Sequence, residues 1–354
     1  MHVKLGIKVW YRKIFNTFAH ESLFKTGNMI KTSFFLCILA IGISCKQGTK
    51  TQNSVAETVS VPTFNADSAY HFTATQVAFG PRVPGTDAHE ACGNYLSAEL
   101  KRLGATVTEQ VATLHLQDGT PIKIKNIIGS FQPENKSRIL LFAHWDTRPY
   151  ADHDSNRDNW MKPIDGANDG AGACATLLEI ARQAGISPPA VGLDIIFFDL
   201  EDWGPPEFPT KDNHYGDWCM GAEYWARNPH IPNYVARYGI LLDMVSAPDA
   251  QFYKESFSQQ NAPAIVKKVW EAARATGYDS YFIDRNGGQI IDDHVPVANY
   301  RNIPCIDIIH YTPNSSSGFG SYWHTLDDNM NNVSKTTLTA VGQTLLYVLY
   351  HEKE

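Results

Sequence analysis

The sequence predicts one α/β domain, with a twisted and mostly parallel central sheet and helices on both faces. Two observations support this fold class. From about residue 62 to the C-terminus, short and continuous apolar runs alternate with segments of helical period, and such runs are typical of strands buried on both faces of a parallel sheet. The chain of 354 residues shows no internal repeat, so the alternation favours one domain rather than two.

Four apolar runs are the predicted strands. They are rich in Ile, Leu and Phe and cover residues 139–143, 195–198, 240–242 and 305–309. Because these runs lack the alternation of a half-exposed strand, we expect helices to cover both faces of the sheet.

Three amphipathic segments are the clearest predicted helices. Residues 88–103 carry apolar side chains at helical spacing and end before a glycine. Residues 263–276 begin with a proline, which the first turn of a helix tolerates, and stop before Gly277. Residues 335–350 follow Ser334, a residue type that often caps a helix. The side chains expected to face inward are Cys92, Leu96, Leu100 and Leu103 in the first segment, and Leu338, Val341, Leu345 and Leu349 in the last.

Composition and charge exclude several classes of protein. The hydrophobic content of 43% is too high for a disordered chain, and neither a heptad nor a Gly-X-Y period is present. The 30 basic and 37 acidic residues give a net charge of −7, and Lys and Arg form no stripe or cluster in the sequence. We therefore expect no nucleic-acid partner.

Residues 1–44 form a separate, basic segment. They hold six Lys and Arg residues against one Glu, and an apolar run over residues 34–43 follows Lys31. This run is too short to cross a bilayer, which needs about 20 residues. A basic stretch followed by a short apolar one predicts a secretory signal peptide. Met29 is well placed to start such a signal, so our hypothesis is that residues 1–28 are an over-extended gene start.

The end of this segment resembles a bacterial lipobox, the motif in which a cysteine is acylated and becomes the mature N-terminus. It reads Gly42-Ile43-Ser44-Cys45, and residues 45–61 make a polar tether before a catalytic domain at residues 62–354. We expect an exported monomer, in the periplasm or anchored to the outer membrane, that contacts the membrane only through a lipid on Cys45. A plain signal peptide with an incidental cysteine is the alternative.

The predicted domain contains four cysteines, at positions 92, 174, 219 and 305. They form no C-x-x-C pair, so a structural zinc site is not predicted. Export would permit disulfides, but the wide spacing does not identify a pair. We expect most of these cysteines to be small buried residues.

Acids and histidines follow most of the predicted strands. The segments are His144-Trp145-Asp146, Asn168-Asp169, Asp199-Leu200-Glu201-Asp202, Asp243, Asp292-Asp293-His294 and His324-Thr325 with Asp327-Asp328-Asn329. One such acid is usually a helix cap or a solvated loop residue. Six segments at the edge where parallel strands end would instead gather many carboxylates, which repel unless a cation neutralises them. Mixed His and Asp/Glu donors suit catalytic zinc, with three protein ligands and one open position.

Several of these motifs resemble one enzyme family. The turn at residues 82–86 (Arg-Val-Pro-Gly-Thr), His144-x-Asp146, Gly-Ala-Asn-Asp at residues 166–169, Glu201-Asp202 and the late His-Thr are similar to the M28 family of zinc aminopeptidase-like enzymes, over about residues 67–352. Within that family, the chain most resembles the animal and bacterial glutaminyl cyclases. Aminopeptidases usually carry Ser-Asp-His where this chain has Asp292-Asp293-His294, and they usually lack a Trp before the final His, where Trp323 stands here.

The resemblance implies a zinc aminopeptidase-like fold and a zinc-dependent acyltransferase. Its substrates would be peptides and proteins with N-terminal Gln, which it would convert to pyroglutamate with release of ammonia. One Zn²⁺ per chain is implied, with Asp169, Asp202 and His324 as ligands.

The resemblance also assigns roles around the implied metal. Glu201 becomes the general acid and base, which would take the proton of the α-amine and give it to the departing ammonia. Asp243 and Asp292 become partners in a hydrogen-bond network beside Glu201, and Trp323 becomes a wall of the substrate pocket.

Three positions depart from the animal cyclases. Asp202 stands where they have Glu, a change that shortens the ligand. Ala143 stands where they have Cys, so their disulfide to the position of Cys174 cannot form. The aromatic residue that follows their acid pair has two candidates here, Trp203 and Trp218, and a core role is equally open for each.

Two rival interpretations remain at this stage. One is a two-zinc aminopeptidase, because His144 and Asp243 are the residue types that would hold a second metal. The other is a binding protein on an inactive scaffold, which the retention of Glu201 and of all three candidate ligands disfavours. A Gln-initiated and a Leu-initiated peptide would discriminate these interpretations.

Overall fold

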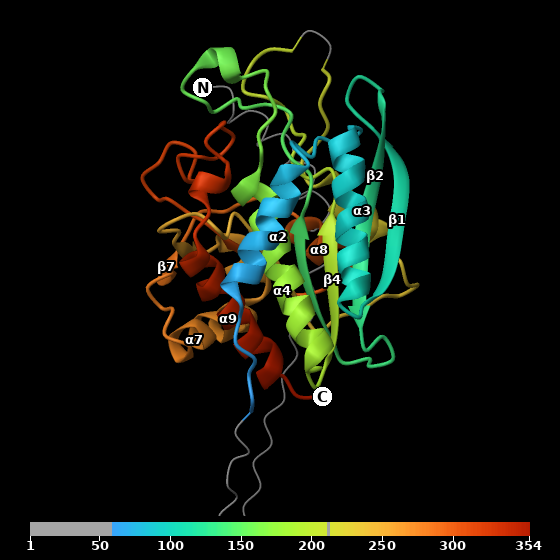
Figure 1. Ribbon diagram of the computed structural model, residues 1–354, viewed down its shortest axis with the longest axis vertical. Helices are drawn as coiled ribbons and strands as arrows, with labels where there is room; N and C mark the ends of the chain where they lie inside the picture. The colour runs from blue at the N-terminus through green and yellow to red at the C-terminus, as the bar shows by residue number, and fades with distance from the viewer. Residues whose placement is uncertain (1–58, 211–212) are drawn as a thin grey trace, which may run out of the picture. The chain divides into compact units, whose positions relative to one another are not determined.

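The computed structural model describes residues 59–210 and 213–354. A six-stranded sheet in the order β1-β2-β4-β3-β5-β8 lies at its centre (Figure 1). Its strands are β1 (Thr106–His115), β2 (Pro121–Phe131), β3 (Arg138–His144), β4 (Gly192–Phe198), β5 (Gly239–Asp243) and β8 (Cys305–Ile309). Strands β4, β3, β5 and β8 run parallel, whereas β2 is antiparallel to both β1 and β4.

The predicted fold class is confirmed. The four predicted strands are the four parallel strands, and the predicted helices are α3 (Asp87–Arg102), α7 (Pro263–Ala275) and α9 (Lys335–His351). Ser334 caps α9, because its side chain accepts a hydrogen bond from the backbone N–H of Thr337 at 3.3 Å. The hairpin of β1 and β2 was not predicted. Residues of β1 are exposed or half-exposed throughout, so this edge strand has no continuous apolar run.

The remaining elements connect these strands. The helices are α2 (Ala66–Ala78), α4 (Ala173–Ile186), α5 (Met220–Arg227), α6 (Ser256–Asn261) and α8 (His294–Arg301), with short turns η1 (Arg157–Asn159), η2 (Ala167–Gly172) and η3 (Met330–Asn332). Strands β6 (Phe252–Lys254) and β7 (Phe282–Asn286) pair in parallel as a separate small sheet. Among the described residues, no helix has both the length and the apolar character that crossing a membrane requires.

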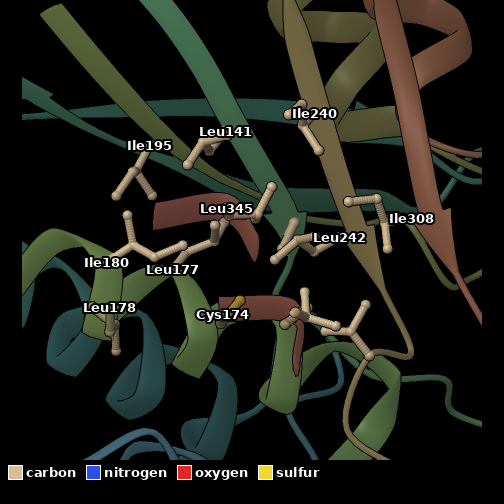
Figure 2. Packing of buried hydrophobic residues seen from close by; sticks show 14 of the residues in the cluster. Leu141, Cys174, Leu177, Leu178, Ile180, Ile195, Ile240, Leu242, Ile308 and Leu345 are labelled. Atoms are coloured by element: carbon tan, nitrogen blue, oxygen red, sulfur yellow. The ribbon is translucent and has the colours of Figure 1, made fainter. Parts of the chain in front are cut away.

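Helices cover both faces of the sheet, as predicted. Helices α2, α3, α4, α7 and α9 contribute to a large core on one face, and α5 and α8 to a smaller core on the other. Figure 2 shows the first core, where Cys174 and Leu177 of α4 lie near Leu141 of β3 and Leu242 of β5. Each such buried aliphatic side chain contributes about 1.5–3 kcal/mol to stability, so this packing fixes the strands whose ends carry the candidate site.

The four cysteines of the domain are all buried and unpaired within the residues that the structure describes. Cys174 donates its thiol hydrogen to the carbonyl oxygen of His144 at 3.1 Å. The predicted signal segment over residues 1–44, Cys45 and most of the tether lie outside the described residues.

Candidate active site

The three predicted zinc ligands lie together at the carboxyl-end edge of the sheet. One donor atom from each of Asp169, Asp202 and His324 lies within 4.8 Å of the others, and all three side chains are buried. The Nε2 atom of His324 is 3.2 Å from Oδ1 of Asp202 and 3.6 Å from Oδ2 of Asp169. These residues come from the loop after β4, the turn η2 and the segment before η3, so only the folded chain brings them together.

The chemistry of this cluster fits a cation. Asp202 is 1% exposed, and neither of its carboxylate oxygens has a hydrogen-bond partner in the described part of the chain. Burial, together with Asp169, raises its pKa well above the ordinary value, and an unpartnered buried carboxylate is costly. Burial and the nearby Arg148 lower the pKa of His324 well below its usual value, which keeps the imidazole neutral as a metal ligand must be. Two carboxylates and one imidazole are a donor set for Zn²⁺.

Arg148 and Asp152 hold this cluster from behind. The guanidinium of Arg148 donates two hydrogen bonds to the carboxylate of Asp152, at 2.8 and 2.6 Å. Oδ1 of Asp152 also lies 3.7 Å from Nδ1 of His324, and Nη1 of Arg148 lies 3.7 Å from Oδ1 of Asp202. A carboxylate behind a ligating histidine orients the ring. Sequence reasoning missed both residues, which belong to the segment after the His-x-Asp motif and carry no spacing signal.

Two further acids fix the backbone of the ligand loops. Asp146 accepts hydrogen bonds from the backbone N–H groups of Glu201 at 3.1 Å and Asp202 at 3.2 Å. Asp328 likewise accepts from the N–H groups of Asn168 at 2.8 Å and Asp169 at 3.1 Å. Both acids stand in motifs that the sequence analysis identified. The hydrogen bonds that each accepts from two successive backbone amides could not be predicted, because the two partners are far apart in the sequence.

The backbone around the cluster adopts uncommon conformations. Leu200, which precedes the acid pair, has φ 55°, and His324 has φ 53°, both in the left-handed region that side chains usually avoid. Gly170 in turn packs so close to β3 that a Cβ there would collide with the carbonyl oxygen of His144. Such strained residues persist only where the surrounding structure enforces them, and they concentrate at functional sites.

Glu201 lies beside Asp292, as expected from the sequence. Donor atoms of Glu201, Asp292 and Cys219 lie within 4.8 Å of one another, and the Cys219 thiol donates to Oε1 of Glu201 at 3.4 Å. Burial raises the pKa of Glu201 well above its ordinary value, and repulsion from Asp292 adds to this although His144 opposes it. Burial and Asp243 raise the pKa of Asp292 to about 7. This carboxyl pair can therefore hold a proton near neutral pH. Cys219 was missed, because a lone cysteine before a helix carries no sequence signal.

Other buried acids surround Asp292. Asp293 and Asp307 have no hydrogen-bond donor to either carboxylate oxygen among the described residues. Burial, with repulsion from Asp292, raises the pKa of each well above its ordinary value, which favours their neutral forms. Asp307 had one signal in the sequence, since it is the polar residue inside the apolar run at 305–309.

Asp243 lies at the end of β5 and belongs to a second group of possible ligands. Its Oδ1 is 3.3 Å from Nε2 of His144, which is also 3.0 Å from Oδ1 of Asp169. Asp169 thus directs one oxygen to His144 and the other to His324. Burial opposes a charge on His144, but hydrogen bonds to Asp146, Asp169 and Asp243 raise its pKa well above the usual value. As an imidazolium, His144 would itself neutralise this end of the site.

Two tryptophans flank the metal cluster. Trp323 stacks on His324, with ring centroids 3.8 Å apart, and Trp218 lies nearly parallel to His324 at 6.1 Å. The guanidinium of Arg148 lies 4.8 Å from the ring of Trp218. Trp218 is 38% exposed, whereas Trp203 is 6% exposed and packs in a separate hydrophobic cluster. The structure therefore places Trp218 at the site and Trp203 in the core, a choice that the sequence left open.

Comparison with known proteins identifies the family. The sequence pattern of peptidase family M28 matches residues 126–349. The chain belongs to peptidase family M28. Among solved structures, this M28 chain is similar to a Zn-dependent exopeptidase from Parabacteroides distasonis, with 57% identity and a TM-score of 0.80 over 83% of this chain and 100% of that one.

Other M28 relatives carry the name of a cyclase. A glutaminyl cyclase from Bacteroides thetaiotaomicron, solved with bound N-acetylhistamine, is 52% identical, with a TM-score of 0.80 over 83% of this chain and 100% of that one. The bovine glutaminyl-peptide cyclotransferase is 29% identical over an alignment of 300 positions that covers 75% of this chain and 76% of the relative. The predicted membership of the M28 family and the resemblance to its cyclases are thereby confirmed.

Proposed function

We propose that this M28 protein is a zinc-dependent glutaminyl-peptide cyclotransferase, which converts the N-terminal Gln of peptides and proteins to pyroglutamate. The observation that carries the proposal is the carboxyl pair of Glu201 and Asp292. Glu201 is the neighbour of Asp202 in the candidate metal cluster, and Trp323 stacks on His324 of the same cluster. The relatives named as cyclases support it. An acid at position 292 gives Glu201 a partner with which to share a proton, which a serine in that place would not.

The reaction forms one bond and breaks one. The α-amine nitrogen of the substrate attacks the side-chain amide carbon of its own Gln, a C–N bond closes the five-membered ring, and the original amide C–N bond breaks to release ammonia. Because both reacting groups belong to one residue, the protein needs only to fold that residue into the reactive shape. Glu201 takes a proton from the amine and returns it to the departing nitrogen, which is worth about 10²–10⁴-fold in rate.

Asp169, Asp202 and His324 would hold the single Zn²⁺. When bound, the cation polarises the amide carbonyl, a contribution of several kcal/mol. The carboxylate of Asp152, 3.7 Å from Nδ1, places a negative charge behind the His324 ring. Trp323 and Trp218 line the approach to His324 and exclude water from the reacting amine.

The test uses purified chain loaded with zinc and two peptides that differ only in their first residue, Gln or Leu. We expect the Gln peptide to lose the mass of one ammonia and the Leu peptide to remain intact. Glu201→Gln should abolish the reaction while retaining the bound zinc. Release of free Gln or Leu without loss of ammonia would contradict the proposal.

One observation favours a second candidate function, that of an M28 aminopeptidase. Donor atoms of His144, Asp169 and Asp243 lie within 4.8 Å of one another, and Asp169 is common to this group and to the Asp202–His324 group. A carboxylate shared by two ligand groups suits a two-metal site. The same peptides discriminate the two functions, because an aminopeptidase would release free Leu and would bind two equivalents of zinc at full activity.

We further propose that the chain is exported and anchored through a lipid on Cys45, and that it acts as a monomer on proteins whose mature N-terminus is Gln. The lipobox-like sequence before Cys45 and the polar residues after it support this. Mass spectrometry of the mature N-terminus would detect the lipid, and Cys45→Ala should release the protein into the soluble fraction. Sedimentation of the purified chain would measure its oligomeric state.

A further inference from the structure

Glu201, Cys219 and Asp292 form a third group of potential ligands, distinct from the two that contain Asp169. We propose that this group is an inhibitory cation site, at which excess Zn²⁺ binds between the thiolate and the two carboxylates and withdraws Glu201 from catalysis. The binding site stands on the geometry of these three residues, and only its inhibitory effect rests on the proposed function.

The spacing of the donor atoms suits a tetrahedral cation. Sγ of Cys219 lies 3.4 Å from Oε1 of Glu201, and one donor atom from each of the three residues lies within 4.8 Å of the others. Zinc–sulfur and zinc–oxygen bonds of about 2.3 and 2.0 Å at a tetrahedral angle separate the two donor atoms by about 3.5 Å. Cys219 and Glu201 therefore already have the separation that the ion requires, with Asp292 as the third ligand and solvent or another ligand in the fourth position.

Asp292 supplies an independent sign that a ligand belongs here. Its side chain is 3% exposed, and Oδ1 accepts a hydrogen bond from the backbone N–H of Asp293 at 2.6 Å. Its Oδ2 is buried and has no hydrogen-bond partner among the residues that the structure describes. A cation within the group would satisfy this oxygen, whose isolation otherwise costs free energy.

The group is close to solvent although its members are buried. Trp218 and Ile291, the residues directly before Cys219 and Asp292, are each 38% exposed. Glu201, at 9%, is the most exposed member of the group. We therefore place the approach of the cation on the side of Trp218 and Ile291.

The donor set selects a thiophilic divalent ion. A thiolate favours Zn²⁺ or Cd²⁺ over Mg²⁺ and Ca²⁺, which prefer oxygen ligands. On binding, the Cys219 thiol releases one proton to solvent and the carboxyl pair releases the proton that it holds near neutral pH, so two carboxylates and one thiolate face a charge of +2. Glu201 then has its lone pair in a bond to the cation and cannot accept the proton of the substrate amine. Zinc should therefore activate the protein at the first equivalent and inhibit it in excess.

The first test measures binding without using activity. The zinc-loaded chain is titrated with Co²⁺, whose bond to a thiolate gives a sulfur-to-metal charge-transfer absorption, and bound metal is counted by equilibrium dialysis. We expect the absorption to grow with a second equivalent of metal in the unaltered chain. Cys219→Ser should abolish it, whereas Cys92→Ser, which changes a cysteine buried in α3, should leave it unchanged. Asp292→Asn, which keeps the thiol, should weaken the second equivalent at least about tenfold.

The second test measures inhibition, with each variant normalised to its own activity at one equivalent of zinc. Excess Zn²⁺ should reduce the rate at least about tenfold in the unaltered chain and in Cys92→Ser, but less than about twofold in Cys219→Ser. Equal inhibition in all three chains, or no charge-transfer absorption in any, would overturn the proposal. If the absorption depends on Cys219 while no zinc level supports cyclisation, the cation site stands and the proposed cyclase function fails.

Discussion

Strands β3 and β4 carry a buried ionic cluster at each end, and the two clusters are built differently. At the amino ends, Arg138 donates to both carboxylate oxygens of Asp194 at 2.7 Å, and Tyr234 and Ser130 donate to the same carboxylate at 2.7 and 2.6 Å. At the carboxyl ends, both oxygens of Asp202 lack a donor within the described part of the chain. The first cluster is complete within the protein, whereas the second is complete only with a ligand.

This difference separates stabilising charges from functional ones. A buried ion pair with every lone pair satisfied needs nothing from outside, and removal of one partner leaves a buried charge that costs several kcal/mol. A buried carboxylate without a donor instead lowers stability until a cation binds. Substitution of the aspartate at the amino ends should therefore lower stability and leave zinc binding intact. Substitution of the aspartate at the carboxyl ends should lower zinc binding and leave the stability of the metal-free chain intact.

Asp202→Asn should give the largest effect on activity. Loss of one anionic ligand removes a contribution of several kcal/mol, which corresponds to about 10³-fold or more in kcat/KM. The folded protein should be as stable as the unaltered chain without metal, because the neutral amide replaces an unpartnered charge. Metal analysis, kinetics and urea unfolding would measure the three quantities. A large loss of stability in the metal-free chain would show that Asp202 is a stabilising charge, like Asp194.

Asp194→Asn should show the reverse pattern. Because Arg138 would keep a buried charge without its partner, we expect a loss of about 3–5 kcal/mol in the free energy of unfolding. The protein that remains folded should bind one equivalent of zinc with unaltered affinity. Weaker zinc binding at unchanged stability would remove the distinction between the two clusters.

Asp152→Asn sharpens the comparison, because this residue touches the cluster without entering it. Its carboxylate supports both Arg148 and His324, and loss of such support costs about 10–100-fold in metal affinity. Competition with a chelator would measure the affinity. Glu207 contacts Asp152 only through its backbone N–H, at 2.9 Å, so Glu207→Gln is the matched control and should leave the affinity unchanged.

Trp218→Ala should give the smallest effect of the four. The half-exposed ring contacts Arg148 and lies parallel to His324, and such aromatic contacts contribute about 0.5–1.5 kcal/mol. We expect KM for a Gln peptide to rise about three- to tenfold, with little change in unfolding free energy. Trp203→Ala, in the hydrophobic cluster, should instead lower stability by about 3–5 kcal/mol. A loss of stability in Trp218→Ala, together with a raised KM in Trp203→Ala, would contradict the roles assigned to the two tryptophans.

The parts of the fold that were predictable from sequence are those with a local signal. Continuous apolar runs indicated the four parallel strands, and a proline and a serine marked the starts of α7 and α9. Strand β1 was not predicted because its residues are exposed or half-exposed along its whole length. It is held in the sheet by pairing with β2, which its own apolar pattern does not indicate. Pairing between strands is a tertiary property that a single sequence does not display.

The candidate site divides in the same way. The predicted ligand residues stand in motifs with recognisable spacing, and the structure brings all three together. Three further site residues contact residues that are distant in the sequence, and no motif or spacing around them predicts these contacts. They are Arg148, Asp152 and Cys219. Sequence reasoning therefore named three residues that the structure brings together and missed those that contact them from other segments.

The hydrogen bonds accepted by Asp146 and Asp328 have a consequence for the order of folding and metal binding. Each carboxylate holds two successive backbone amides, those of Glu201 and Asp202 in one case and of Asn168 and Asp169 in the other. All four amides lie in connecting segments, yet they should exchange hydrogen with solvent as slowly as those of the neighbouring strands. The loops that carry the candidate ligands would then be ordered before a metal ion binds, so folding of the domain would not depend on zinc.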